Sequence, residues 1–282
     1  LESSDLGKEV SYPNSYNPKL LHPIARSHNR LNIGLSDDAN QKLPFFGNDV
    51  WRAYELSWLD LNGKPIIAIC HLSIPCDSKF LIESKSLKLY FNSLNNKKFA
   101  SYLDVEALIA KDCSNICALN ITAQVVLIND NSSQASFDRF DKLDGVYLDD
   151  QDIKIDSYTP DANILKLSNT DKKVTRSVYS NLLKSNCPIT NQPDWGSIWI
   201  SYSGLEIDKA SLLEYIVSFR GHQEFHEHCV ERIFIDILNS CKPSKLTVAA
   251  FYTRRGGLDI NPWRSNDAEY LTKQINKRLI RQ

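Results

Sequence analysis

Residues 50–74 read VWRAYELSWLD (50–60), LNG (61–63) and KPIIAICHLSI (64–74). The two outer runs are rich in aliphatic, aromatic and β-branched residues, which is typical of strands. Asn62-Gly63 between them is a strong signal for a tight turn that joins antiparallel strands. This stretch therefore predicts a β-hairpin, and the fold is built outward from an antiparallel sheet.

The residues after the hairpin predict two helices and another strand. Residues 81–90 lead into a helix toward position 95, and a second helix is expected up to residue 117 with Asp104 as its N-cap. Strands are expected over 121–128 and 147–158. The apolar stripe of the second helix is formed by Val105, Leu108, Ile109 and Cys113.

The second half of the chain repeats this order of elements. Strand-like runs occupy 174–184 and 197–202, a helix follows Asp208, a second helix is expected over 223–239, and a strand over 246–253. Each half therefore reads strand, strand, helix or helices, strand, strand. This order predicts an α+β module used twice, with antiparallel sheets, and argues against alternating parallel βαβ units.

The domain boundaries follow from composition. Residues 1–48 are polar and rich in proline, and they predict an extended N-terminal arm. The first module is expected over 49–158 and includes a polar surface loop at 129–144, a linker over 159–173, and the second module over 174–282.

The composition limits the class of protein. The chain has 282 residues, 42% of them hydrophobic, and 33 basic against 34 acidic residues give a formal net charge of −1. Such a chain is neither disordered, collagenous, coiled-coil nor membrane-spanning, and its charge argues against wrapping nucleic acid. Its odd cysteine count and the lack of an apolar leader predict reduced thiols in a soluble, cytoplasmic protein. The seven cysteines are Cys70, Cys76, Cys113, Cys117, Cys187, Cys229 and Cys241.

The stretch SNCPITNQPDWG at 185–196 holds the strongest candidate nucleophile. Cys187 lies in a turn-rich segment that Pro188 and Pro193 stiffen, and Asp194 follows seven residues later. A thiolate is a good nucleophile and a nearby carboxyl group can shuttle protons. From the pattern alone, a buried inert cysteine beside a surface aspartate fits as well.

A second candidate is EFHEHC at 224–229, at the start of the long second-half helix. His222 lies one turn before His226, so a zinc site is one interpretation. However, adjacent helical residues point to different faces, so His226, Glu227 and His228 cannot all converge on one ion. A solvated polar helix start and a polar ligand-binding edge are the other interpretations.

Two further segments suit anions. ESKSLK at 83–88 combines hydroxyl groups and amines near a helix start, and TRRGG at 253–257 presents two arginines before a glycine pair. A solvated helix turn and a strand-end turn with surface arginines explain the same residues. The sequence holds no GxGxxG, Walker, GxSxG or paired CxxC motif.

These segments together resemble the NADPH-dependent 7-cyano-7-deazaguanine reductases, the nitrile reductases of queuosine biosynthesis, in their long two-module form. The family signature ESKSxKLY stands complete at 83–90. The chain also matches the catalytic loop of the family at 184–187 and 192–196, and further family blocks at 218–220, 224–227 and 254–265.

The resemblance implies two tandem tunnelling-fold modules, with antiparallel sheets and helices packed on one face, in a homodimer. Cys187 would attack the nitrile carbon to form a thioimide, Asp194 would be the general acid, and two NADPH molecules would be consumed per turnover without any metal. The product would be 7-aminomethyl-7-deazaguanine, a tRNA-modification precursor, and no direct contact with nucleic acid or membrane is implied. Substrate-lining residues would be Ile82, Glu83, Ser84, His226 and Glu227, and cofactor-binding residues would be Ser84, Lys85, Arg255 and Gly256.

Two other functions also fit the sequence. One is another tunnelling-fold enzyme that acts on pterins or purines, although such enzymes use zinc-binding histidines and this chain lacks a convincing set. The other is a non-catalytic purine- or pterin-binding protein that keeps the pocket glutamates.

Overall fold

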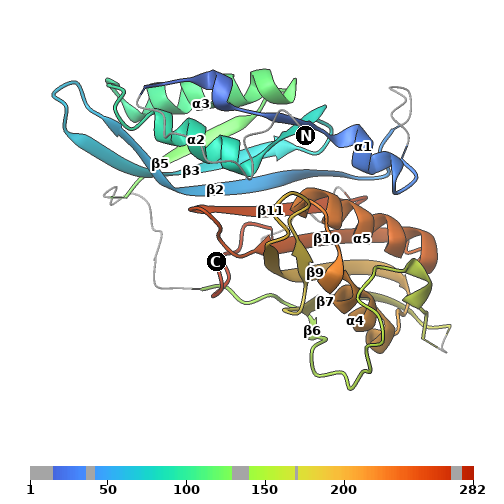
Figure 1. The fold of residues 1–282 in the computed structure, drawn as a ribbon. Coiled ribbons are helices and arrows are strands. Elements are labelled where there is room, and N and C mark those ends of the chain that lie inside the picture. The colour runs from blue at the N-terminus through green and yellow to red at the C-terminus, as the bar shows by residue number, and fades with distance from the viewer. Residues whose placement is uncertain (1–14, 36–41, 129–139, 169–170, 268–274) are drawn as a thin grey trace. The chain divides into compact units, whose positions relative to one another are not determined.

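The computed structural model describes residues 15–35, 42–128, 140–168, 171–267 and 275–282, and the chain divides into two compact units (Figure 1). The first unit comprises Leu1–Asp38, Asn48–Phe137 and Arg254–Ile260, and the second comprises Ala39–Gly47, Asp138–Thr253 and Asn261–Gln282. The segment 254–260 thus belongs with the first unit, although most of the second unit precedes it in the sequence. Of the polar loop expected at 129–144, residues 129–139 lie outside the described ranges.

The sheet of the first unit contains the predicted hairpin. Strands β2 (Phe46–Leu59) and β3 (Pro65–Pro75) pair antiparallel, and β5 (Thr122–Leu127) pairs antiparallel with the other edge of β3. The amide of Gly63 donates to the carbonyl of Asp60 over 3.0 Å, and Gly63 has a φ of 87°, which only glycine adopts readily. The hairpin and the strand expected at 121–128 are therefore confirmed.

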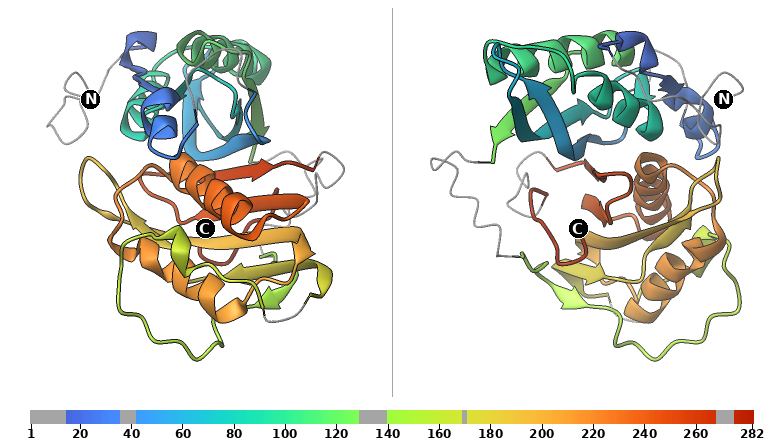
Figure 2. Two further views of the ribbon diagram at one scale, coloured as in Figure 1. Left: turned by 90° about the vertical axis from the view of Figure 1, so that its right-hand side faces the viewer. Right: turned by 60° about the vertical axis from the view of Figure 1, so that its left-hand side comes forward.

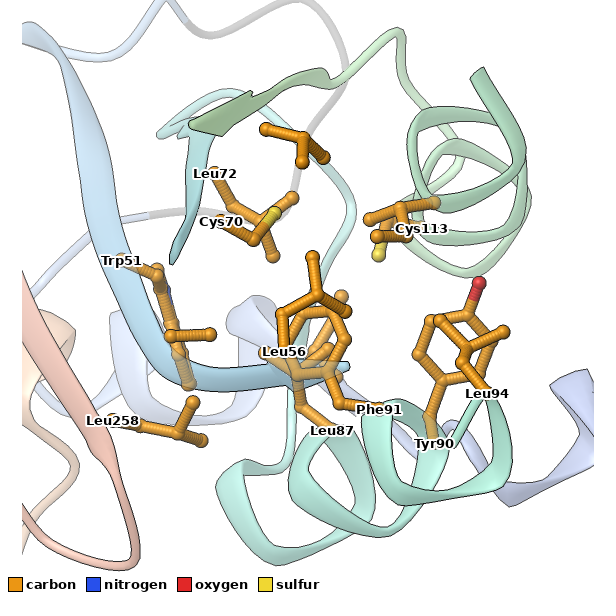
Figure 3. Packing of buried hydrophobic residues seen from close by; sticks show 14 of the residues in the cluster. Trp51, Leu56, Cys70, Leu72, Leu87, Tyr90, Phe91, Leu94, Cys113 and Leu258 are labelled. Atoms are coloured by element: carbon orange, nitrogen blue, oxygen red, sulfur yellow. The ribbon is translucent and has the colours of Figure 1, made fainter. Parts of the chain in front are cut away.

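Two helices bury their apolar stripes against this sheet: α2 (Ser84–Ser93) and α3 (Tyr102–Cys117). Figure 3 shows Leu87 and Phe91 of α2 beside Leu56 of the sheet. The predicted stripe of α3 is confirmed, because three of its four residues are buried and Leu108 packs against the same core. The fully buried side chains of the core include Trp51, Leu56, Leu72, Ile74 and Tyr90.

The cap of α3 differs from the prediction. The N-cap is Ser101, whose hydroxyl accepts from the amide of Asp104, while the carboxylate of Asp104 accepts from the amide of Ser101 over 3.0 Å. Asp104 is thus the third residue of the helix. It acts in a capping box, because both groups satisfy amides that the first turn leaves without partners.

Residues 15–35 are not an extended arm. They form a short 3-10 helix (Pro18–Leu20), strand β1 (Pro23–Ala25) and helix α1 (Arg26–Leu31). Strand β1 pairs antiparallel with β4 (Phe80–Ile82), and the guanidinium of Arg26 lies 2.5 Å from the buried carboxylate of Asp49. Proline content misled the prediction, because the buried residues Leu21 and Ile24 supply enough apolar contact to order the segment.

The sheet strands of the second unit pair in the order β11-β10-β9-β7-β6. All its pairs are antiparallel except β6 with β7. The views of Figures 1 and 2 place α4 (Lys209–Ser218) and α5 (His226–Cys241) on one face of this sheet. The strands are β6 (Val146–Tyr147), β7 (Lys173–Ser180), β9 (Pro193–Leu205), β10 (Lys245–Tyr252) and β11 (Leu258–Ser265).

Two strand predictions for segments of the second unit were wrong. The run 174–184 is divided into β7 and β8 (Lys184–Asn186), because the amide of Asn181 turns away to the carboxylate of Asp149. Of the strand expected over 147–158, only Tyr147 is in a strand, since the next residues turn, with the amide of Gln151 donating to the carbonyl of Leu148.

Each unit thus has the antiparallel sheet and helical cover that the resemblance implies, and the α+β class is confirmed. Within the described residues, none of the helices combines the length and the apolar character needed to span a bilayer.

Candidate active site

Cys187 and Asp194 lie on a tight hairpin in the second unit. Strand β8 pairs with the start of β9, so that Ser185 stands opposite Asp194. The intervening loop closes on itself, because the amide of Cys187 donates to the carbonyl of Gln192 over 2.9 Å and the amide of Asn191 donates back to Cys187 over 3.0 Å. The proline-bounded loop predicted from the sequence is therefore ordered around the cysteine.

The segment before α5 adds to the other side of β8. The amide of Asn186 donates to the carbonyl of His222 over 2.8 Å, and the amide of Glu224 donates to the carbonyl of Asn186 over 3.1 Å. Because residues 222–224 are committed to this pairing, α5 begins at His226 and not at 223 as the sequence predicted. The start of α5 is thereby fixed next to the hairpin of Cys187.

This arrangement brings His226 to Asp194. The imidazole Nε2 lies 3.2 Å from Oδ2 of the carboxylate, and both side chains are about 95% buried. Cys187 and Glu227 are 3% and 2% exposed. A buried carboxylate–imidazole pair can hold a proton and deliver it to a substrate atom, which is the property required of a general acid. The solvated helix start considered for 224–229 is wrong, because His226, Glu227 and His228 are all buried.

A second network supports this helix start and was missed by the sequence reasoning. The guanidinium of Arg232 donates two hydrogen bonds of 3.0 Å each to the carboxylate of Glu224, and Nε2 of His222 lies 2.9 Å from the same carboxylate. Burial alone would raise the pKa of Glu224, but the hydrogen bonds from His222 and Arg232 outweigh it, and the pKa is lowered. The eight-residue spacing of Glu224 and Arg232 crosses a helix start, so no periodic pattern reveals it.

Cys229 is a different kind of cysteine from the candidate nucleophile. It is completely buried on α5, and burial raises its pKa well above the ordinary thiol value. It therefore keeps its proton and serves as a packed, polar side chain.

The residues predicted from the ESKS segment lie in the first unit. Ile82 ends β4 and is buried in the core of that unit. Glu83 is the N-cap of α2, and its two carboxylate oxygens accept from the amides of Lys85 and Ser86 over 2.7 Å each. These two amides already have a carboxylate partner and are therefore not available to a phosphate, so the side chains of this segment are the stronger candidates for the anion site.

The predicted cofactor residues also lie in the first unit. Gly256 has a φ of 58° and its carbonyl accepts from Nζ of Lys88 over 2.8 Å, which joins the 254–257 turn to α2. Lys85 lies one turn before Lys88 on the same helix, and Arg255 precedes Gly256. The structure thus brings the two anion-binding candidates of the sequence analysis to one place.

The predicted site residues accordingly form two groups, one in each unit. Among the described residues, no three histidine, cysteine, aspartate or glutamate side chains are grouped so as to hold a metal ion. The second-unit group is Cys187, Asp194, His226 and Glu227, and the first-unit group is Ile82, Glu83, Ser84, Lys85, Arg255 and Gly256.

Two family models match successive parts of the chain. Residues 12–125 match the family described as "Nitrile reductase, 7-cyano-7-deazaguanine-reductase N-term", and residues 193–270 match "QueF-like protein". The apo crystal structure of archaeosine synthase QueF-Like covers 35% of this chain and 95% of its own, with 15% identity and a TM-score of 0.30.

Two curated relatives are named NADPH-dependent 7-cyano-7-deazaguanine reductase. The protein from Coxiella burnetii (strain CbuK_Q154) is 49% identical over 100% of this chain and 97% of its own length. The protein from Acidovorax ebreus (strain TPSY) is 47% identical over 97% of both chains. The chain belongs to the family of 7-cyano-7-deazaguanine nitrile reductases.

Proposed function

We propose that this chain reduces the nitrile of 7-cyano-7-deazaguanine to the aminomethyl group of 7-aminomethyl-7-deazaguanine, in the pathway to queuosine in tRNA. The names of the full-length relatives support the reaction. The observation that carries the proposal is the buried pair of Asp194 and His226, at 3.2 Å, beside the closed loop of Cys187.

The chemistry begins at Cys187. Its thiol gives its proton to the Asp194–His226 pair and the sulfur adds to the nitrile carbon. One carbon–nitrogen π bond breaks, and the pair passes the proton to the nitrogen, which gives a thioimide. NADPH, when bound, supplies one hydride to this carbon at each of two stages. Between the stages the sulfur leaves as thiolate, and the pair delivers a further proton to the nitrogen. Two hydrides and two protons together convert the nitrile to the amine.

Glu227 is our candidate for holding the purine edge. The ring N–H and the exocyclic amine of a deazaguanine are adjacent donors, and a carboxylate accepts from both. Its position directly after His226 at the buried start of α5 supports this role. Ile82, Glu83 and Ser84 remain substrate-lining candidates on the strength of the family resemblance.

The first unit holds residues whose chemistry fits the phosphates of NADPH. Lys85 and Arg255 supply positive charge, Ser84 supplies a hydroxyl, and the backbone of Gly256 lies beside α2. Phosphate groups bind well to such a set of side-chain donors. Glu83 occupies the amides of Lys85 and Ser86, so these side chains are our candidates for holding the phosphates.

An intact mass measurement tests the proposal. Protein incubated with 7-cyano-7-deazaguanine and no NADPH should gain the mass of one ligand, and Cys187→Ala should gain nothing. Cys241→Ala is the matched control, because Cys241 is also buried but ends α5, about 22 Å from His226 at 1.5 Å per residue. If calorimetry shows binding by the native protein without any adduct, the chain is a binding protein or reduces its ligand noncovalently, and the thioimide is excluded.

The Glu227 assignment has a separate test. Glu227→Ala should weaken the calorimetric affinity for the nitrile by about 2–4 kcal/mol, because the buried donors of the ligand lose their acceptor. An unchanged affinity would remove Glu227 from the substrate site.

We also propose that the chain forms a homodimer that acts on the free base and not on tRNA. Sedimentation should then give twice the chain mass of 32.1 kDa, and added tRNA should not change the sedimentation boundary.

A further inference from the structure

His226 is the first residue of α5, and Nε2 of its imidazole is buried without a hydrogen-bond partner among the described residues. Nε2 reaches Asp194 at 3.2 Å, but the geometry of that contact falls outside that of a hydrogen bond. Another contact must therefore fix the plane of the ring.

That contact is Tyr252. The two rings stack with their centroids 3.9 Å apart and their planes at 30°. Tyr252 is the last residue of β10 and is completely buried, so its ring presents a fixed surface to the imidazole. Aromatic rings pack against each other in a limited set of relative orientations, and a stacked pair in a buried site restricts the rotation of both rings.

The hydroxyl groups of Tyr252 and Ser185 are buried and make no hydrogen bond among the described residues, so packing and not hydrogen bonding positions the tyrosine. It lies in a buried cluster with the hydroxyl of Ser185 and the thiol of Cys229. Burial raises the pKa of both Tyr252 and Cys229 well above their ordinary values, so the cluster is neutral. These groups belong to β10, β8 and α5, the elements that meet around Asp194 and His226.

Gly196 makes space for the tyrosine ring. It stands opposite Tyr252 in the β9–β10 ladder, and a Cβ atom at this position would lie 3.2 Å from Cδ1 and 3.3 Å from Cε1 of the ring. Its φ is outside the left-handed region, so the backbone conformation does not require glycine. The absence of a side chain at Gly196 therefore leaves the space that the ring of Tyr252 occupies.

We infer that Tyr252 is a positioning residue for proton delivery: its ring holds the imidazole of His226 with Nε2 toward Asp194, and Gly196 is needed because it leaves room for that ring. This inference rests on the proposed function, since the proton is delivered to the nitrile nitrogen. It assigns a role to Gly196, the final residue of the QPDWG stretch at 192–196, although Gly196 has no side chain that could take part in the reaction.

The test compares steady-state kinetics of NADPH-dependent nitrile reduction. Tyr252→Phe keeps the ring and should retain kcat within about twofold. Tyr252→Leu removes the flat surface and should lower kcat by about tenfold or more, with KM for the nitrile nearly unchanged, because misplaced catalytic groups lose rate before affinity. Gly196→Ala should lower kcat in the same way by displacing the ring a few tenths of an ångström. Tyr202→Leu, at a buried tyrosine six residues along β9 from Gly196, is the control for losing a buried ring, and its kcat should be that of the native protein.

Double variants with His226→Ala test whether Tyr252 and Gly196 act through the imidazole. If Tyr252 acts through the imidazole, Tyr252→Leu and Gly196→Ala should each change kcat by less than about twofold in a His226→Ala background. The inference would be overturned if Tyr252→Leu and Gly196→Ala lowered kcat as much in the His226→Ala background as in the native protein. It would also be overturned if Tyr252→Phe lowered kcat as much as Tyr252→Leu does. If Tyr252→Leu does not fold, the effect of Gly196→Ala on kcat with and without His226→Ala tests the same coupling. A native protein that does not reduce the nitrile refutes the proposed function instead, before any variant is compared.

Discussion

The guanidinium of Arg264 donates two hydrogen bonds to one carboxylate oxygen of Glu231, from Nε over 3.0 Å and from Nη2 over 2.8 Å, and both side chains are completely buried. Glu231 lies on α5 one turn beyond Glu227, and Arg264 lies on β11. The pair therefore ties the helix that carries the candidate site to the sheet.

Removing one partner of this pair should be costly. Arg264→Met should destabilise the protein by about 3–5 kcal/mol, because it leaves the Glu231 carboxylate buried without its cation, and the double variant Glu231→Met/Arg264→Met should recover much of that loss. Urea denaturation measures both. Lys154→Ala, in the exposed pair with Asp156, is the control and should not change the midpoint. An Arg264→Met midpoint equal to the native one would contradict the ion pair.

The Glu224 network predicts a dependence of stability on pH. The folded protein lowers the pKa of Glu224 from its ordinary value of 4.5, so the ionised carboxylate contributes stability above that pH. This contribution is lost as the pH falls through the lowered folded value.

Glu224→Gln should therefore cost about 1–3 kcal/mol at pH 7, and the difference from the native protein should shrink below pH 4.5. Chemical denaturation at a series of pH values measures it. A difference that stays constant with pH would mean that packing, and not charge, explains the effect.

Glu83 has a structural task that can be separated from its expected role in binding. Glu83→Ala should lower the free energy of unfolding by about 1 kcal/mol, since the amides of Lys85 and Ser86 lose their acceptor. Glu83→Asp should keep the cap, because aspartate is a preferred N-cap residue.

Thermal unfolding of Glu83→Ala and Glu83→Asp measures how much the N-cap contributes to the free energy of unfolding. Titration of Glu83→Asp with the nitrile then reports on binding alone, because this variant is expected to keep its helix start. Equal stability of Glu83→Ala and the native protein would show that the cap contributes nothing.

Asp112 accepts hydrogen bonds from two tyrosines of the first unit. The hydroxyls of Tyr16 and Tyr90 donate to the same oxygen over 2.8 and 2.7 Å. Burial and Asp112 raise the pKa of Tyr16 to about 12 and that of Tyr90 further.

Asp112→Ala should cost about 2–4 kcal/mol, because it leaves two phenol donors without their acceptor, and Asp112→Asn should cost less because an amide oxygen still accepts. Urea denaturation compares them. If the alanine and asparagine variants were equally stable, the hydrogen bonds would not be the source of the effect.

Local sequence signals correctly gave several elements. The hairpin around Gly63, the strand at 121–128 and the helix after Asp208 each rest on neighbouring residues: a turn that needs a positive φ, a run of apolar residues, or a side chain that accepts from the next turn. The Cys187–Asp194 loop was equally visible, since its prolines and spacing lie in one short segment.

The errors occurred where a distant contact decided the outcome. The helix expected from 223 starts at His226, because Asn186 pairs with residues 222–224. The run 174–184 is broken where Asn181 meets Asp149. Neither partner lies near enough in sequence to alter a local pattern.

The sequence by itself thus determined the α+β class, the order of the strands and helices along the chain, and the family, because these depend on local periodicity and on motifs read along the chain. Only the tertiary structure decided that His226 meets Asp194 and that Tyr252 stacks on His226. These contacts join residues 32 and 26 positions apart, and only the pairing of strands and the burial of helix faces bring such residues together.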